Sequence, residues 1–222
     1  SCRAAAIIGT LQAGFTDPGY LTEVSQEIME REALIGVSMT GIMENPDICL
    51  DPRIQKQGAK LIKKTNRMIA ELIGINPAAR TTCIKPEGTA SCVLGTSSGI
   101  HPHHARRYIR RVQANKLDEV YKHFNRTNPK ACTESVWSAN DSDDVISFCI
   151  EVPDGAKIKN QMSAIDLLKS VRSTQKNWVT NGKDESLCVK PWLNHNVSNT
   201  INVKPEEWDE VAKFIYKNRE HF

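Results

Sequence analysis

Several features that mark large classes of protein are missing from this sequence. No stretch approaches the roughly 20 consecutive apolar residues that a membrane-spanning helix needs, and no charged start precedes a long apolar run, as in a secretory signal. The seven cysteines are odd in number and form no CxxC pair, which argues against a disulfide framework and a zinc site. We therefore expect a cytoplasmic protein with reduced thiols, no bound metal and no membrane partner.

The composition is that of an ordinary globular protein. Of the 222 residues, 40% are hydrophobic and 25% are charged, a balance that excludes a disordered tail, a collagen-like fibre and a coiled coil. The length corresponds to one large domain or two small ones. Because the chain starts at Ser1 without a methionine, we expect it to be cut from something longer.

One basic stretch explains the small positive charge. The sequence has 29 basic and 26 acidic residues, a net charge of +3. Residues 101–116 contain no acid and five of the basic residues, namely Arg106, Arg107, Arg110, Arg111 and Lys116. These side chains either meet an anion or form a solvated face with carboxylate partners. Since the remainder of the chain is slightly acidic, we expect no direct nucleic-acid binding.

Helical and strand patterns alternate along the chain, which is typical of an α/β architecture with a mostly parallel sheet. The clearest helix spans 52–73, between an N-cap at Asp51 and a C-cap at Gly74, and its expected apolar stripe includes Leu61, Met68 and Leu72. Residues 125–144 are polar and are interpreted as a surface excursion. The other expected helices lie at 4–11, 21–28, from Ser163 and from Pro205, and the expected strands at 34–39, 80–84, 108–113, 145–152 and 197–203.

The stretch from Lys85 to Gly99 is rich in glycine, serine and threonine and follows an expected strand. It is neither a Walker A loop nor a GxGxxG turn. Gly88 would let backbone N–H groups point inward, Thr89 and Ser91 add hydroxyl donors, and a helix start would favour an anion. The composition is compatible with a phosphate-binding loop and equally with an ordinary tight connection.

The remaining polar candidates have plain structural interpretations beside functional ones. His101, His103 and His104 form an HxHH pattern, but no Cys or Asp cluster accompanies them, so we expect capping or hydrogen-bonding roles rather than a metal site. His195 and Asn196 either present polar groups at a barrel mouth or satisfy local backbone groups. Cys83 and Cys92 flank the glycine-rich loop, and we expect buried thiols there. No Ser/His/Asp or Cys/His signature occurs.

Longer strings in the sequence resemble one known family. The run RTTCIKPEGTASCVLGTSSGIHP, residues 80–102, closely resembles adenosylcobalamin-dependent ribonucleoside-triphosphate reductases. Further strings resemble the same family and follow its order along the chain. They are IGTLQAGFTD at 8–17, LIGVSMTGI at 34–42, YIRR at 108–111, SAIDLL at 163–168 and HNVS at 195–198. The resemblance therefore extends over nearly the whole chain.

This resemblance implies a fold, a reaction and a site. The fold is the C-terminal portion of the ten-stranded α/β barrel of ribonucleotide reductases, so residues 1–222 would form a partial catalytic barrel domain. The reaction is the reduction of a ribonucleotide, in which adenosylcobalamin generates a cysteine radical and a cysteine pair, served by a thioredoxin-like reductant, supplies electrons. In relatives the matching loop holds the substrate phosphates, which here corresponds to Pro86, Glu87, Gly88, Thr89, Ala90 and Ser91.

The departures from the family pattern restrict what this chain does alone. The family's Asn-Pro-Cys-Gly-Glu finger loop and its tail cysteines are absent, so we expect no catalytic residue in this chain. Glu87 stands where better-known relatives carry a small residue, and an acid there would repel phosphate unless it points away. We expect the partner to be the remainder of a reductase chain or a complementing subunit, with unpaired strand edges and exposed apolar faces on this chain. The alternative is a non-catalytic nucleotide-binding or regulatory subunit that reuses half a barrel.

Overall fold

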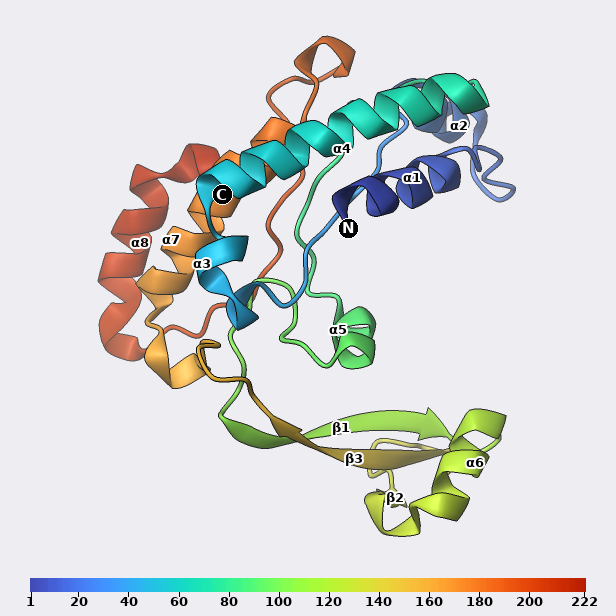
Figure 1. The fold of residues 1–222 in the computed structure, drawn as a ribbon, viewed down its shortest axis with the longest axis vertical. Helices are drawn as coiled ribbons and strands as arrows, with labels where there is room; N and C mark the ends of the chain where they lie inside the picture. The colour runs from blue at the N-terminus through green and yellow to red at the C-terminus, as the bar shows by residue number, and fades with distance from the viewer. The chain divides into compact units, whose positions relative to one another are not determined.

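The computed structural model describes residues 1–222, which form two compact units. The larger unit comprises residues 1–103 and 155–222, and the smaller unit comprises residues 104–154. The expectation of a single partial barrel domain stays a prediction. The elements in Figure 1 are α1 (Cys2–Ala13), α2 (Glu23–Glu32), α3 (Pro46–Cys49), α4 (Pro52–Ile73), α5 (Gly88–Leu94), β1 (Arg107–Asn115), α6 (Glu119–Thr127), β2 (Cys132–Glu134), β3 (Asp143–Glu151), α7 (Ala164–Thr174) and α8 (Trp208–Lys217).

The longest helix, α4, begins and ends where the sequence predicts. The Asp51 carboxylate accepts a hydrogen bond from the Arg53 N–H (2.7 Å), and Gly74 takes the left-handed conformation (φ 75°) that ends the helix. The expected stripe was wrong in part, because Met68 and Leu72 are 56% and 78% exposed. The face that α4 buries holds Gln55, Ala59, Ile62, Thr65, Asn66 and Ala70, and α1 packs beside it. No helix is long and apolar enough to cross a membrane.

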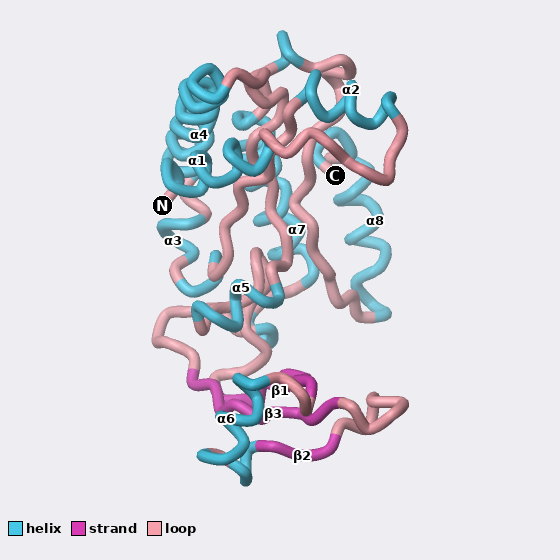
Figure 2. The backbone as a smooth tube through the Cα atoms, turned by 90° about the vertical axis from the view of Figure 1, so that its right-hand side faces the viewer, coloured by secondary structure: helices cyan, strands magenta, loops and turns pink.

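Three extended segments run side by side through the larger unit, at 34–38, 80–84 and 195–198 (Figure 2). The middle segment pairs with both of the others in parallel. The bridges are Val37 to Thr82 and Ile84 to Val197. Two of these segments match the expected strands at 34–39 and 80–84, whereas the third overlaps the expected strand at 197–203 only at residues 197 and 198. The parallel direction was predicted. The three segments form isolated bridges rather than regular strands, because each pair makes only a few of the hydrogen bonds of a ladder.

The outer edge of segment 195–198 is closed by one side chain. The Gln175 amide nitrogen donates to the His195 carbonyl (2.8 Å), and its amide oxygen accepts from the Val197 N–H (3.1 Å). Gln175 is 8% exposed and opens a π-helical turn, Gln175–Val179, directly after α7. The side-chain amide thus supplies the donor and the acceptor that a further strand would supply.

The core of the larger unit is built around Trp178, which is 1% exposed. Its indole N–H donates to the Cys83 carbonyl (3.0 Å), and the Thr82 hydroxyl donates to the Trp178 carbonyl (2.8 Å). A Cβ at Gly58 on α4 would lie 2.8 Å from the Trp178 ring. The indole therefore fixes the distance between the middle segment and α4.

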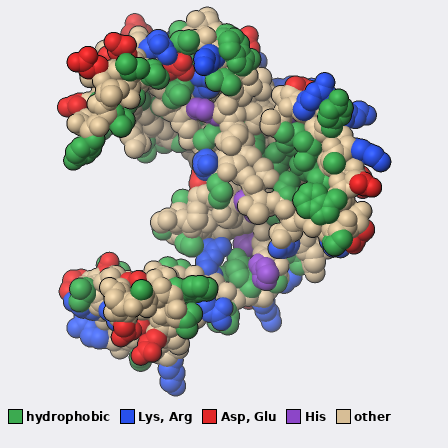
Figure 3. Space-filling model, turned by 180° about the vertical axis from the view of Figure 1, so that it is seen from behind, with side chains coloured by type: hydrophobic (Ala, Val, Ile, Leu, Met, Phe, Trp, Pro, Cys, Tyr) green, Lys and Arg blue, Asp and Glu red, His purple; other side chains and the backbone are tan.

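A second, smaller core lies between α7 and α8. The N-terminus of α7 has a capping box, in which the Ser163 hydroxyl accepts from the Asp166 N–H (3.2 Å) and the Asp166 carboxylate accepts from the Ser163 N–H. The apolar residues of α8 are only partly buried. Val211 is buried, but Trp208 and Ile215 are 59% and 39% exposed. Such apolar side chains are visible on the surface of the larger unit (Figure 3).

The smaller unit contains the only regular sheet, and that sheet is antiparallel. Its strand order is β1-β3-β2, with β1 and β3 paired over nine residues from Arg107–Glu151 to Asn115–Asp143. The expectation of a mostly parallel sheet was therefore wrong for this part of the chain, where both strand pairs are antiparallel. Helix α6 packs on one face through the ring contact between Phe124 and Phe148. The surface excursion at 125–144 includes the end of α6 and β2.

The edge closure by Gln175 gives a test of the larger unit. Gln175→Leu would leave the His195 carbonyl and the Val197 N–H without partners, at about 1–3 kcal/mol for each group. We expect urea unfolding to show a loss of about 2–5 kcal/mol. The matched control is Gln26→Leu, since the Gln26 amide bonds only Glu30 at the surface (3.0 Å), and its cost should stay below about 0.5 kcal/mol. Equal losses in the two variants would contradict the edge role.

Candidate functional site: the turn that follows segment 80–84

The candidate phosphate loop leaves the end of segment 80–84 and turns directly into α5. Glu87 occupies the left-handed region (φ 53°) at the N-cap of this helix. The Ser91 N–H donates to the Glu87 carbonyl (2.9 Å), so the hydrogen bonds of the helix begin at Ser91. Gly88, Thr89 and Ala90 are exposed, and their N–H groups belong to the first turn, which has no partners within a helix. The turn therefore offers N–H donors and the Thr89 hydroxyl to an anion.

Pro86 and Ser91 hold this turn in shape. Ser91 is 1% exposed, and its hydroxyl donates to the Gly88 carbonyl (3.2 Å). The Pro86 carbonyl accepts a hydrogen bond from the Ser98 hydroxyl. The N–H and the hydroxyl group of Ser91 are thus both hydrogen-bonded within the protein, whereas Thr89 is exposed. The sequence grouped these residues as one loop, and the structure separates them into those that shape it and those that face solvent.

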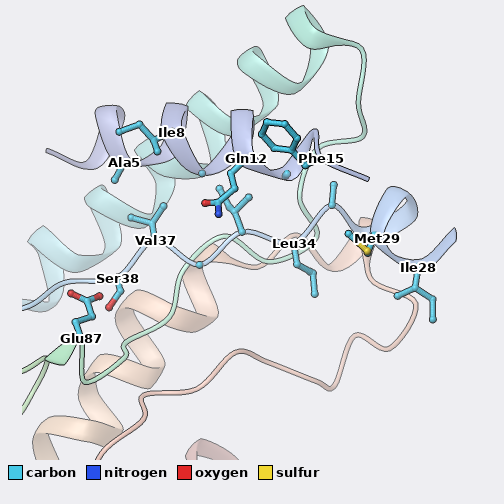
Figure 4. A pocket seen from close by; sticks show the side chains of 15 residues that line it. Ala5, Ile8, Gln12, Phe15, Ile28, Met29, Leu34, Val37, Ser38 and Glu87 are labelled. Carbon is cyan, nitrogen blue, oxygen red and sulfur yellow. The ribbon is translucent and has the colours of Figure 1, made fainter. Parts of the chain in front are cut away.

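The carboxylate of Glu87 extends toward Ser38 (Figure 4). It lines a groove formed mainly by α1, α2 and residues 33–38. Its charge also acts on Cys83. Burial raises the pKa of the Cys83 thiol, and the nearby Glu87 carboxylate raises it further. Cys83 is therefore a protonated buried thiol at neutral pH, as expected from the sequence. The same expectation was wrong for Cys92, which is exposed on α5.

The segment 96–101 packs against the backbone at the start of the loop. A Cβ at Gly99 (φ 55°) would overlap the Lys85 carbonyl oxygen, so only glycine allows this approach. The Gly99 N–H donates to the Thr40 hydroxyl (3.0 Å), and the Ser97 N–H donates to the Glu44 carboxylate (2.9 Å). The segment around Thr40 and Glu44 thus holds the glycine-rich stretch in place.

Two of the three loop histidines complete this support. The His101 Nε2 accepts from the Thr200 N–H (2.8 Å), so its Nδ1 carries the proton and donates to the Ser98 carbonyl (2.8 Å). His103 is buried, and its Nε2 bonds the Glu44 carboxylate. His104 belongs to the smaller unit, where its ring meets Tyr108 edge-on. No group of three or more His, Cys, Asp or Glu side chains could hold a metal ion.

A small hollow of about 290 Å³ is lined by Leu34, Ile35, Gly36, Cys83, Lys85, His195 and Asn196. The His195 Nδ1 lies 3.2 Å from the Thr82 carbonyl, to which it donates. Burial lowers the pKa of His195, and the Arg80 guanidinium lowers it further against the opposing effect of the Thr82 carbonyl. His195 is therefore neutral at physiological pH and satisfies a backbone group, as one of the two sequence interpretations held.

The basic stretch is largely paired within the smaller unit. Arg107 bonds Glu151 (2.7 Å), Lys116 bonds Asp141 (2.5 Å), Arg106 donates to the Pro153 carbonyl (3.2 Å), and Arg110 lies over the Tyr108 ring. Arg110 is half-buried and Arg111 is exposed, because successive residues of β1 point to opposite faces. These contacts favour the interpretation as a solvated face with local partners.

Sequence reasoning missed Thr40, Glu44 and Gln175, which support the site. Each acts on a segment more than ten residues away, through one hydroxyl, carboxylate or amide group. The only signal of these contacts in the sequence was the glycine at position 41. It takes the left-handed conformation (φ 70°) and marks the turn between Thr40 and Glu44.

Comparisons with known proteins relate this geometry to one family. No family model matches the chain. The adenosylcobalamin-dependent ribonucleoside-triphosphate reductases of Lactobacillus acidophilus and Lactobacillus helveticus are 23% and 22% identical, over 90% of this chain and 29% of each relative. The crystal structure of a B12-dependent class II ribonucleotide reductase superposes with a TM-score of 0.74 and 18% identity, over 99% of this chain and 33% of that chain.

The chain has the fold of one part of a class II ribonucleotide reductase. The resemblance read from the sequence motifs is thereby confirmed, and so is the expectation of an α/β portion of the reductase barrel. The chain spans about 29% of the length of the curated relatives that it matches. A match over this share shows the fold and not the activity, substrates or partners of a whole reductase.

The close approach at Gly99 predicts a large effect of one methyl group. Gly99→Ala adds an overlap with the Lys85 backbone to the strain of a positive φ, and we expect a loss of about 3 kcal/mol in unfolding free energy. Gly95→Ala is the matched control, because its φ is also positive (67°) but nothing lies within 4 Å of the added Cβ. Its cost should be about 1 kcal/mol. Urea unfolding measures both, and similar values would contradict the close approach.

The environment of His195 predicts a dependence of stability on pH. The pKa of folded His195 lies below its ordinary value of 6.5, so its contribution is fully present above that value and is lost as the pH falls toward the folded pKa. We expect the unfolding free energy of His195→Gln to fall less than that of the native chain when the pH is lowered from about 7.5 to 5.5. A native slope in His195→Gln would contradict this assignment.

Proposed function

We propose that this chain is part of a ribonucleotide reductase that reduces ribonucleoside triphosphates to deoxyribonucleotides. The observation that carries the proposal is the exposed first turn of α5, directly after segment 80–84, in a chain with the fold of a class II reductase. The segment would contribute the substrate-phosphate loop, formed by Pro86, Glu87, Gly88, Thr89, Ala90 and Ser91.

The donor set of this turn suits a phosphate group. The N–H groups of Gly88, Thr89 and Ala90 point out of a helix start, where aligned peptide dipoles favour an anion. The Thr89 hydroxyl adds a donor, while Pro86 and Ser91 fix the turn from within. The Glu87 carboxylate extends toward Ser38, which supports a loop that accepts phosphate despite its acidic residue.

In such an enzyme the work of these residues is binding and orientation. Hydrogen bonds at the first turn of α5 would hold the phosphate chain and thereby fix where the attached ribose lies. No catalytic residue is assigned to this chain, because the radical cysteine motif is absent from it. The remainder of the reductase, or a complementing subunit, would supply the cysteines, and a thioredoxin-like protein would return electrons to them.

We assign the cofactor to the whole assembly. The relatives are named adenosylcobalamin-dependent, and in the proposed enzyme that cofactor starts the radical chemistry. The donor set described above suits an anion rather than a corrin, and we assign no residue of this chain to the cofactor. All seven cysteines are free thiols, which supports a reducing, cytoplasmic setting.

The phosphate role is tested with a ribonucleoside triphosphate and the matching ribonucleoside. In a reductase assembly that contains this chain, Thr89→Ala should weaken triphosphate binding about ten- to a hundredfold, the effect of losing one hydrogen bond to a charged group. Nucleoside binding should not change. Val93→Ala is the control, since Val93 is 82% exposed on the same helix but outside its first turn.

Isothermal titration calorimetry gives the affinities, and product analysis gives the activity. Equal losses in Thr89→Ala and Val93→Ala, or an unchanged triphosphate affinity in Thr89→Ala, would remove the phosphate role. The chain alone should form no deoxynucleotide. Measurable product from the chain alone would contradict the proposed division of the enzyme.

A further inference from the structure

The outward face of α4 carries a row of basic side chains. The helix packs beside α1 and beside the π-helical turn that follows α7, and it crosses the front of the larger unit in Figure 1. Between Pro52 and Ala70 its sequence contains no acidic residue. Five basic residues of this stretch recur at spacings of three and four, so they share one side of the helix. They form the cationic row: Lys56, Lys60, Lys63, Lys64 and Arg67.

Three of these cations have no acidic partner within the chain. Lys56, Lys60 and Lys64 are exposed and form no ion pair. They follow one another at intervals of four residues, where like charges repel and destabilise a helix. The charges also oppose the helix dipole, since Arg53 lies in the first turn and Glu71, the one acid, in the last. The cationic row thus works against the stability of the helix that carries it.

The other two cations of the row are bound to the loop beside the helix. The Lys63 amine donates to the Lys183 carbonyl (2.9 Å), and the Arg67 guanidinium bonds the Asp184 carboxylate (2.6 Å). A hollow of about 420 Å³ lies among these side chains, with Asp184 and Glu71 as its acids. These contacts fix two cations in place and leave the three exposed amines to meet anionic groups from outside the chain.

An apolar row runs beside the cationic row on the same helix. Its four side chains are between 37% and 78% exposed, and they are Ile54, Leu61, Met68 and Leu72. They stand seven, seven and four residues apart, and the rotation of 100° per residue places them together on one side of the cations. Three of them were expected from the sequence to face the core, yet no element of the chain covers them.

Two adjacent rows of this kind suit a second helix. A helix packed along α4 repeats its own side chains every three to four residues, so its acidic residues would meet the cations while its apolar residues meet the apolar row. A nucleic acid would use the cations and leave the apolar row in water. A membrane surface takes up an apolar face with cations around it, whereas here the cations lie on one side only and the core of the protein on the other.

We propose that the outward face of α4 docks an acidic amphipathic helix of another protein. The cationic row would steer and orient that helix, and the apolar row supplies area to be removed from water. The opposite face of α4 packs through Ala59 and Ile62 on the array formed by segments 34–38, 80–84 and 195–198. A continuation of the array along its edges would therefore leave the outward face free. The inference does not depend on the proposed reduction.

Two designed peptides test this assignment on the full chain. The probe is a helical peptide as long as α4, 22 residues, with glutamates and leucines spaced to face the two rows. The control peptide has the same composition in permuted order. Isothermal titration calorimetry should show at least about tenfold weaker binding of the permuted peptide, and binding of the ordered peptide should weaken as the salt concentration rises. Equal binding of the two peptides, or binding of neither, would overturn the docking surface.

Matched charge reversals locate the binding on α4. Lys60→Glu with Lys64→Glu should weaken binding of the ordered peptide about tenfold or more. This variant should unfold no more readily than the native chain, because each new acid lies three or four residues from a remaining cation. The control is Lys213→Glu with Lys217→Glu, two exposed lysines at the same spacing on α8, which should bind like the native chain. Equal weakening in the two variants would overturn the site on α4.

The apolar row and the other occupants are tested separately. Met68→Gln with Leu72→Gln should weaken peptide binding about tenfold and leave its salt dependence in place, because only apolar contacts are lost. Unchanged binding in this variant would overturn the amphipathic helix as the occupant. Tighter binding of an oligothymidylate of about 20 nucleotides, or of phosphatidylglycerol vesicles, than of the ordered peptide would also overturn it.

Discussion

The pairing of segment 80–84 on both of its edges is the constraint on which the larger unit depends. Its backbone bonds the segments at 34–38 and 195–198. Its threonine hydroxyls are used as well, with Thr81 bonded to the Gly182 carbonyl (2.8 Å) and Thr82 to the Trp178 carbonyl. All five residues of the segment are buried, and a shift of one residue would turn each side chain to the opposite face and break the bonds of both threonines. The position at which the chain leaves this segment, at Lys85, is therefore fixed.

The fixed position of Lys85 matters because α5 is too short to be stable as an isolated helix. It has seven residues, well below the roughly 12–15 residues at which an isolated helix becomes marginally stable. Its direction depends on the contacts around its start, namely the approach of Gly99 to the Lys85 backbone and the bond from Ser98 to Pro86. The donors of its first turn are thus held in place by the array and by the glycine-rich stretch, and not by the helix.

The sequence was most informative where the signal and its effect lie within one helical turn. Asp51 and Gly74 delimit α4 because a cap acts on its own helix, and Ser163 acts on Asp166 in the same way. The stripe on α4 and the buried face of α8 were less predictable. Trp208 is apolar but exposed, because the face that a helix buries depends on neighbours distant in sequence.

The candidate site was predicted as a stretch of residues but not as a geometry. Composition and resemblance pointed to positions 86–91, yet they could not separate Ser91, whose hydroxyl bonds Gly88, from the exposed Thr89. The direction of the Glu87 carboxylate and the edge closure by Gln175 also depend on tertiary contacts.

The outer strand edges of the two units show how this chain manages exposed backbone. In the smaller unit, β2 has only three residues, and β1 carries Arg107 and Arg111, both common protections against edge pairing. In the larger unit, Gln175 closes one edge. The remaining edge, at 34–38, has glycine at its centre and an apolar groove beside it. Three of the four outer edges are therefore protected against pairing, and the edge at 34–38 is left open.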